Sequence, residues 1–307
     1  MEKVIIFGAS TMGEIASIYL RKKYNIINFC DNDKNKQGMK LNDITIISPE
    51  ELEKLGAKVI VASEYESEIF EQLLTMNIDS IEFFRLPFAN SSGKGFISCN
   101  ETVELAKKKG LSMWEFLEKS YGERTDAIIN KVIELGCLQK SKRICEIGPG
   151  TGRYLKKVID NMSCDLDEYI IYETAIDWKI YLKNTYPVSV RNTDGYSLKH
   201  ELDKSVDLIH AHAVFVYLDL VNSFEYFQEM VRICKPGGYI VFDFLPCSFF
   251  DVPGVKKWLA SEHRFPTVLP ESTVENFMKD LGVNLISDFT IEYGPGFSRY
   301  HVYRRDI

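Results

Sequence analysis

The segment 145–155, CEIGPGTGRYL, places glycines at alternate positions directly after a short apolar run. Gly148, Gly150 and Gly152 leave the backbone bare where a strand would give way to a helix, and glycine tolerates positive φ. In an open parallel sheet, the loop after the first strand lies at the carboxyl edge, where ligands bind. The segment therefore predicts a strand, a ligand-facing turn and a helix. Taken alone, the glycines are also compatible with a simple tight turn.

A second pattern of this kind opens the chain. VIIFGASTMGEIA, residues 4–16, runs from an apolar strand through a glycine turn into a helix. Ser48-Pro49-Glu50-Glu51 has the residues of a helix start with a capping box. Further strands and helices alternate after it, in IINFCDND, KVIVAS, ESEIFEQLLTMNI and SIEFFRL. This alternation is typical of a parallel sheet with helices on both faces.

The alternation stops and then restarts. ANSSGKG, residues 89–95, has the composition of a linker, and residues 101–138 have the apolar spacing of two or three helices. Strand patterns return in RICEIG, YIIYE, SVDLIHAHAV and GGYIVFDFL. We predict an α/β fold with two doubly wound Rossmann-like domains. Residues 1–90 form the first, 91–140 a linker and helical segment, and 141–307 the second.

Composition narrows the class of protein. The 307 residues carry a net charge of −7, which argues against nucleic acid as the main partner. The seven cysteines form no C-x-x-C pair, which favours reduced thiols over a disulfide framework or a zinc site. No apolar run reaches the roughly 18 residues of a membrane span, and the N-terminus lacks the pattern of a signal peptide. We expect a cytoplasmic protein without a membrane partner.

Residues 141–307 resemble the class I S-adenosylmethionine-dependent methyltransferases. EIGPGTG is similar to their motif I, VDLIHAHAVFVYL to their fourth strand, and RICKPGGYIVFDF to the turn and strand that follow. EYGPGFSRYHVYRR resembles the antiparallel hairpin that ends the family's sheet. The resemblance implies S-adenosylmethionine as cofactor and methyl transfer as the reaction.

The resemblance also implies the cofactor-binding residues. The family carries an acid after the second strand that binds both ribose hydroxyls, and Glu173 of YIIYE matches it. Asp194-Gly195 matches the pair that meets the adenine. Glu146 is expected to brace the glycine loop or contact the amino acid end, where Arg153 is a candidate for the cofactor carboxylate. The predicted cofactor site comprises Glu146, Gly148, Gly150, Gly152, Glu173, Asp194 and Gly195.

A hydroxyl acceptor needs a base, and histidine is the commonest one. His210 and His212 alternate along a strand, so their side chains share a face. His212 lies nearer the carboxyl end and is the predicted base, with Asp243 on the next strand as the group that orients it. A role in core packing is the alternative for His212, and we expect His210 to be structural.

The acceptor pocket is predicted from aromatic and charged residues near the carboxyl edge. We select Tyr217, His263, Arg299 and His301 as substrate-binding residues, with Phe215, Trp258 and Arg264 as further candidates. Arg299 and His301 would read an anionic group such as phosphate or carboxylate. The sequence has no carboxylate cluster with the spacing of metal ligands, so we expect no metal.

The motifs of the first domain are less specific than those of residues 141–307. VIIFGASTMG followed by FCDNDKNKQG resembles the N-terminal Rossmann-like domain of bacterial sugar acyltransferases and nucleotide-sugar enzymes. Its turn departs from G-x-G-x-x-G, since only Gly8 and Gly13 remain, which puts dinucleotide binding in doubt. Asp31 is predicted to be a turn residue, with ribose binding as the alternative.

Together these features predict a methyltransferase for a small molecule. We expect O-methylation of a sugar or sugar-linked group in polysaccharide or secondary-metabolite biosynthesis, on a small-molecule acceptor that is sugar-linked or anionic. A homodimer is compatible with the sequence. Two alternatives stay open. One is a bifunctional or NAD-dependent oxidoreductase that uses the first domain, and the other is a non-catalytic protein that binds the cofactor as a ligand.

Overall fold

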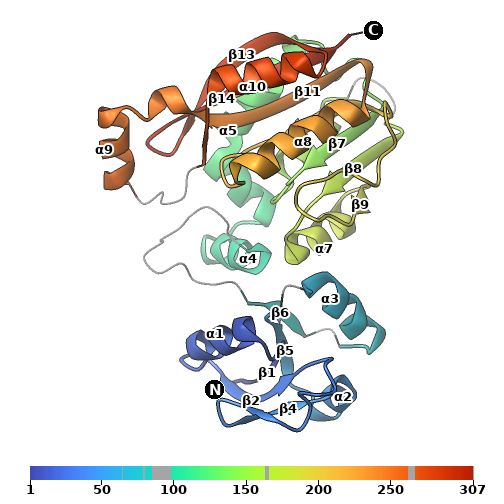
Figure 1. Ribbon diagram of the computed structural model, residues 1–307, viewed down its shortest axis with the longest axis vertical. Helices are drawn as coiled ribbons and strands as arrows, with labels where there is room; N and C mark the ends of the chain where they lie inside the picture. Colours follow the sequence, from blue (N-terminus) through green and yellow to red (C-terminus); the bar gives the residue numbers. More distant parts are fainter. Residues whose placement is uncertain (64, 79, 85–97, 163–165, 262–266, 307) are drawn as a thin grey trace. The chain divides into compact units, whose positions relative to one another are not determined.

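A computed structural model of the chain describes residues 1–63, 65–78, 80–84, 98–162, 166–261 and 267–306 (Figure 1). The chain divides into two compact units, Met1–Ala89 and Asn90–Ile307. The helices predicted within 91–140 belong to the second unit. The predicted linker 89–95 lies outside the described residues.

The first unit is built on one sheet with the strand order β3-β4-β2-β1-β5-β6. Its strands are parallel except for β3, which is antiparallel to β4. The strands are β1 Lys3–Phe7, β2 Asn25–Cys30, β3 Lys40–Leu41, β4 Ile44–Ile47, β5 Lys58–Val61 and β6 Ile81–Phe83. The helices are α1 Thr11–Leu20, the 3₁₀ turn η1 Pro49–Glu51, α2 Leu52–Leu55 and α3 Glu66–Thr75.

Two separate apolar clusters cover the two faces of this sheet. Ala16 of α1 packs with Val4 and Ile6 on one face, while Leu52 and Leu73 pack with residues of the same strands on the other. Helices therefore cover both faces, as the alternating pattern predicts. The β3–β4 hairpin was not predicted from the sequence. Its turn is Asn42-Asp43, both with positive φ, which residues of this type adopt more readily than most.

Capping boxes start the helices at three points. Ser48 and Glu51 form the predicted box before η1 and α2. Ser98 with Glu101 and Ser112 with Glu115 form further boxes before the two helices of the predicted helical segment, α4 Cys99–Lys108 and α5 Met113–Glu134. Each box satisfies backbone N–H groups that the first turn of a helix leaves unpaired.

The second unit has a sheet in the order β13-β14-β11-β10-β7-β8-β9, with β12 paired to the end of β11. Strands β9, β8, β7, β10 and β11 are parallel, and β13 and β14 form the predicted antiparallel hairpin. The strands are β7 Arg143–Ile147, β8 Glu168–Tyr172, β9 Ser189–Arg191, β10 Val206–Ala211, β11 Cys234–Pro246, β12 Val268–Leu269, β13 Val283–Tyr293 and β14 Gly296–Arg305.

Helices pack on both faces of this sheet (Figure 1). On one face α5 and α6 pack against Ile144, Tyr169 and Val302, and on the other α8 and α10 pack against Phe242 and Tyr303. The remaining elements are α6 Arg153–Asp160, α7 Ile176–Thr185, α8 Leu220–Ile233, the 3₁₀ turn η2 Cys247–Phe249, α9 Val252–Ala260 and α10 Glu271–Asp280. Strand order reverses between β7 and β10, and the carboxyl edge at that point is where a doubly wound sheet binds its ligand.

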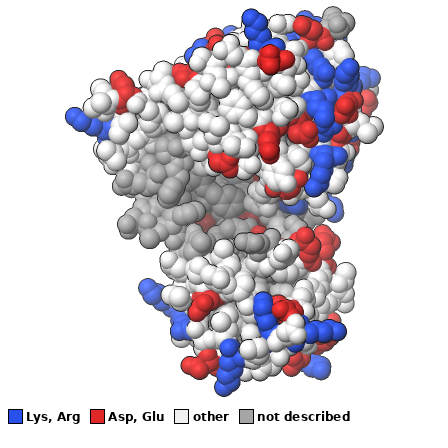
Figure 2. All heavy atoms as spheres, viewed as in Figure 1, with Lys and Arg blue, Asp and Glu red and all other residues white. Residues whose placement is uncertain are grey.

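The composition led to expectations about two features, the charged side chains of the surface and the cysteine thiols. Acidic and basic side chains intermingle on the face of the second unit shown in Figure 2. The described cysteines Cys30, Cys99, Cys137, Cys145, Cys234 and Cys247 are free thiols. Among the described residues, no helix is both long enough and apolar enough to cross a membrane.

Candidate active site

The glycine loop joins β7 to α6, and each of its glycines has positive φ. A Cβ on Gly148 would lie 2.8 Å from the Val214 side chain, and one on Gly152 would lie 2.5 Å from the Leu182 side chain, so a larger residue would displace these side chains and strain a backbone of positive φ. A Cβ on Gly150 would have no atom within 4 Å. Gly150 therefore borders open space at the carboxyl edge of β7, as expected of a loop that approaches a ligand.

Glu173 follows β8 and is 5 % exposed. Its Oε2 accepts a hydrogen bond from the N–H of Gly150 and its Oε1 one from the N–H of Ala175, both at 2.8 Å. Burial raises the pKa of this carboxyl group, while the two backbone donors oppose the shift. A carboxylate oxygen accepts more than one hydrogen bond, so both oxygens keep capacity for a diol.

Asp194 and Gly195 lie in the loop after β9. The Asp194 carboxylate accepts hydrogen bonds from the N–H and hydroxyl of Ser197 and from Lys199. Burial works against ionisation, but these bonds outweigh it and lower the pKa of Asp194 to about 2. Gly195 has a φ of 87°, and its N–H donates to the Thr193 hydroxyl. These hydrogen bonds hold the loop in place and keep the Asp194 carboxyl group ionised. The contact of Asp194 and Gly195 with adenine stays a prediction.

Glu146 lies on β7, one residue before the strand ends, and is 1 % exposed. Its Oε2 accepts a hydrogen bond from the Tyr169 hydroxyl at 2.7 Å and lies 4.0 Å from Nε2 of His210. Burial raises its pKa to about 8, although the bond from Tyr169 lowers it. Glu146 therefore contacts Tyr169 and His210 within the sheet. Among the described residues it has no hydrogen bond to the backbone of the glycine loop.

His210 and His212 share a face, as predicted, and Nδ1 of His210 lies 3.0 Å from Nε2 of His212. The predicted bond between Asp243 and His212 is wrong. Oδ1 of Asp243 instead accepts from the N–H of Ala213 at 2.6 Å, while Nδ1 of His212 lies 3.3 Å from the Tyr300 hydroxyl. The reason is local, because Ala213 has a φ of 56° and its N–H is aimed at β11.

His212 is also more deeply buried than a base at a cleft would be. It is 6 % exposed and its ring stacks on Tyr154 with centroids 3.9 Å apart. Burial lowers its pKa well below the usual histidine value, and the neighbouring His210 adds to the effect. The imidazole is therefore neutral over the ordinary pH range.

Asp243 belongs to a polar cluster that sequence reasoning did not assemble. Its Oδ2 is buried without a hydrogen-bond partner among the described residues, and so are Nε and Nη2 of Arg124. Arg124 lies on α5 with its guanidinium 5.1 Å from the centre of the Tyr293 ring, and charge interactions link it to Asp243 and Tyr300. We call Arg124, Arg153, Tyr217, Asp243, Tyr293 and Tyr300 the polar cluster.

The cluster includes one of the predicted acceptor residues. Tyr217 accepts a hydrogen bond from the Tyr293 hydroxyl at 2.6 Å, and it interacts electrostatically with Arg124 and Asp243. Arg153 stacks on Tyr121 and donates to Tyr154. The signal that could have identified Arg124 is its place in the apolar stripe of α5, four residues before the fully buried Ile128.

Arg299 and His301 lie on the other face of the sheet from this cluster. Arg299 forms ion pairs with Asp288 and Glu275, and Nδ1 of His301 meets the Tyr303 hydroxyl at 2.8 Å. The expectation that Arg299 and His301 lie close to the cleft and bind the acceptor is not met, because successive strand residues alternate between faces and Tyr300 takes the cleft side. His263 and Arg264 lie outside the described residues. Phe215 and Trp258 are buried in apolar clusters.

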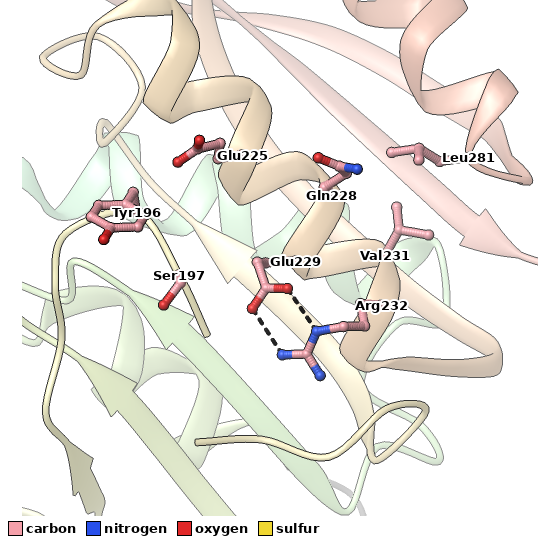
Figure 3. Close-up of a pocket in the computed structure, with 8 residues that line it drawn as sticks. All are labelled: Tyr196, Ser197, Glu225, Gln228, Glu229, Val231, Arg232 and Leu281. Carbon is pink, nitrogen blue, oxygen red and sulfur yellow. Dashed lines mark hydrogen bonds and ion pairs between the residues drawn. The ribbon is translucent and has the colours of Figure 1, made fainter. Parts of the chain in front are cut away.

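A surface hollow lies along α8 (Figure 3). Arg232 within it is already paired with Glu229 and Asp203. None of the predicted cofactor or catalytic residues lines this hollow, so it is separate from the candidate site. Its lining residues are Tyr196, Ser197, Glu225, Gln228, Glu229, Val231, Arg232 and Leu281.

In the first unit, contacts within the fold account for the turn residues. A Cβ on Gly8 would lie 2.3 Å from the carbonyl oxygen of Ala62. Asp31 accepts hydrogen bonds from the N–H groups of Ala9 and Asp33 and from Lys36. These bonds agree with a turn role for Asp31. Among the described residues of both units, no group of His, Cys, Asp and Glu side chains could hold a metal ion.

One family model matches within each unit of the chain. Residues 145–242 match the model described as methyltransferase domain, and residues 1–83 match the one described as C2185-like, N-terminal. The match over residues 145–242 supports an S-adenosylmethionine-dependent methyltransferase. The first-unit match does not confirm the resemblance to sugar acyltransferases and nucleotide-sugar enzymes. A comparison with curated proteins gives no match.

Solved structures match this chain at low sequence identity. Magnesium protoporphyrin IX methyltransferase from Synechocystis, solved with S-adenosylhomocysteine, is 10% identical over 70% of this chain and 91% of that one, with a TM-score of 0.47. A methyltransferase from Methanosarcina mazei is 14% identical over 57% and 97%, with a TM-score of 0.45. A chain from the Haloferax volcanii complex of the Trm112 activator with a methyltransferase is 14% identical over 63% and 95%, with a TM-score of 0.49.

The residues of the candidate site fit this cofactor. Gly150 borders open space next to Glu173, whose fixed carboxylate suits a ribose diol, and Arg124 and Arg153 supply cations for a carboxylate. When bound, S-adenosylmethionine supplies an electrophilic methyl group on a positively charged sulfur. The protein then has to align the acceptor, exclude water and accept the acceptor's proton.

Proposed function

We propose that this methyltransferase O-methylates a small hydroxylated molecule of the sugar type, in polysaccharide or secondary-metabolite biosynthesis. The observation that supports this most is the pairing of Asp243 on β11 with Tyr300 on β14. Residues paired across two strands share a face and stand side by side. Asp243 and Tyr300 also interact electrostatically, so the Asp243 carboxyl and the Tyr300 hydroxyl are the proposed partners of two neighbouring hydroxyl groups of the acceptor.

Burial strengthens this proposal. Asp243 is completely buried and this burial raises its pKa, and a buried carboxyl oxygen without a hydrogen-bond partner costs free energy unless a ligand supplies a donor. An acceptor hydroxyl is such a donor. The tyrosine hydroxyls of the polar cluster also suit a polar acceptor better than an apolar one. The proposed roles of the cofactor residues, Glu146, Gly148, Gly150, Gly152, Glu173, Asp194 and Gly195, are those stated above.

The test uses matched acceptors and a labelled methyl group. Simple sugars are compared with deoxy analogues that lack one hydroxyl of a neighbouring pair, and S-adenosylhomocysteine production is measured. We expect turnover with the diol, and Asp243→Asn should raise KM for the diol more than for the deoxy analogue. Turnover restricted to amine, thiol or apolar acceptors would overturn the proposal.

A further inference from the structure

A row of buried polar side chains crosses the sheet from Glu146, on β7 below the glycine loop, to the polar cluster. The Tyr169 hydroxyl lies 2.7 Å from Oε2 of Glu146 and 2.9 Å from Nε2 of His210. Nδ1 of His210 lies 3.0 Å from Nε2 of His212, and Nδ1 of His212 lies 3.3 Å from the Tyr300 hydroxyl. Each of the five residues is at most 6 % exposed. We call them the buried chain.

The direction of hydrogen bonding along the buried chain is set at its end. A neutral imidazole has one N–H and one acceptor nitrogen, and a phenol has one O–H. Tyr169, His210 and His212 each take part in two bonds, so each must donate one and accept one. If Glu146 is ionised, every donor points toward it and both histidines carry hydrogen on Nε2. If Glu146 is protonated, every bond reverses and both histidines carry hydrogen on Nδ1.

We propose that the buried chain is a proton relay in which Tyr300 takes the proton of the acceptor hydroxyl and Glu146 stores it. This inference rests on the proposed O-methylation. As the acceptor oxygen bonds to the methyl carbon and the carbon–sulfur bond breaks, the acceptor proton passes to Tyr300. The Tyr300 proton passes to His212, one from His212 to His210, one from His210 to Tyr169, and one from Tyr169 to Glu146. One proton enters, one is stored, and each group between them ends neutral.

The two ends of the chain suit these roles. At one end Tyr300 stands next to Asp243, whose unpartnered oxygen would hold a neighbouring hydroxyl of the same acceptor. At the other end burial raises the pKa of Glu146 to about 8, which fits an acceptor of protons near neutrality. The groups that face Glu146 are Tyr169, His210, Glu173 and Arg153. Those that face His212 and Tyr300 are Tyr154, His210, Arg153, Arg124 and Asp243.

Nuclear magnetic resonance tests the relay without turnover. The full chain is labelled with ¹⁵N-histidine, and ring nitrogen shifts report which nitrogen carries hydrogen. We expect His210 and His212 to change together from the Nδ1–H to the Nε2–H form as pH rises through about 8. Glu146→Gln should abolish this change. Tautomers that stay the same on both sides of that pH in the wild type would overturn the relay.

Kinetics provide a second test with a matched control. Tyr169→Phe removes a hydroxyl bound to the buried His210, and Tyr303→Phe removes one bound to the buried His301 on the opposite face. Only the first should lower kcat, by about 10²-fold, the lower end of the contribution of a general base. Both should bind S-adenosylhomocysteine like the wild type in calorimetry. Equal kcat in the two variants, with binding intact, would overturn the relay and leave the proposed function standing.

Discussion

The N–H of Gly150 donates to Oε2 of Glu173 over 2.8 Å and so joins the glycine loop to the acid that follows β8. The remaining lone pairs of that carboxylate are free to accept from the ribose hydroxyls. Glu173→Ala should weaken binding of S-adenosylhomocysteine by about 1.5 to 3 kcal/mol, the usual contribution of hydrogen bonds to a charged group. Calorimetry measures the loss, and an unchanged affinity would remove Glu173 from the site.

The rate of methyl transfer should depend on pH through Glu146 and not through His212. Burial holds the pKa of His212 far below neutrality, so this imidazole stays uncharged as kcat changes. Glu146 can accept a proton only when ionised, so kcat should rise as pH increases through about 8. His212→Asn should lower kcat by about 10² to 10⁴ and leave cofactor affinity nearly intact. If kcat does not depend on pH in this range, or if His212→Asn keeps full kcat, His212 has a role in core packing only.

The buried His301 should make stability sensitive to acid. Burial lowers its pKa from 6.5 to about 4, so the unfolded chain binds more protons between those values. The free energy of unfolding should therefore fall as pH drops below 6.5, by up to about 1.4 kcal/mol per pH unit from this residue. Urea unfolding of the wild type and of His301→Gln isolates the effect. Parallel pH curves for the two proteins would show that His301 contributes nothing.

The first unit should show no response to nicotinamide cofactors. Asp31 is occupied by backbone and lysine donors, and Gly8 is required by its contact with Ala62. A ligand at 100 times its dissociation constant would stabilise the unit that binds it by about 2.7 kcal/mol. We expect no shift of the melting temperature of that unit with NADH or NADPH. A clear upward shift would favour the alternative of an oxidoreductase.

Strand patterns and glycines were enough to predict the central strands of both sheets, because the buried runs and turns are local in sequence, whereas the short strands β3, β4, β9 and β12 were missed. The polar cluster was not predictable in the same way, since Arg124, Asp243 and Tyr300 come from separate elements that only the fold brings together. The error at Arg299 and His301 has a specific cause. Period-two alternation places these residues on one face of β14, but it does not say which face meets the cleft.

The interpretation of His212 and Asp243 as a pair failed for a similar reason. Neighbouring parallel strands bring their ends close together, which made the contact plausible from the sequence. The positive φ of Ala213 turns a backbone N–H onto Asp243 instead, and a conformation of this kind at an alanine has no clear signal in the sequence.

The cytoplasmic location and the homodimer stay predictions.

The most direct test of the cofactor site compares two glycines with similar geometry. Gly150 and Gly110 have φ values of 50° and 65°, and a Cβ on either would have no atom within 4 Å. Backbone strain is therefore matched in Gly150→Val and Gly110→Val, and only Gly150 lies next to Glu173. Binding of S-adenosylhomocysteine to the full chain is measured by calorimetry. We predict that Gly110→Val binds like the wild type and Gly150→Val does not bind, and equal affinities in both variants would contradict the assignment of the site.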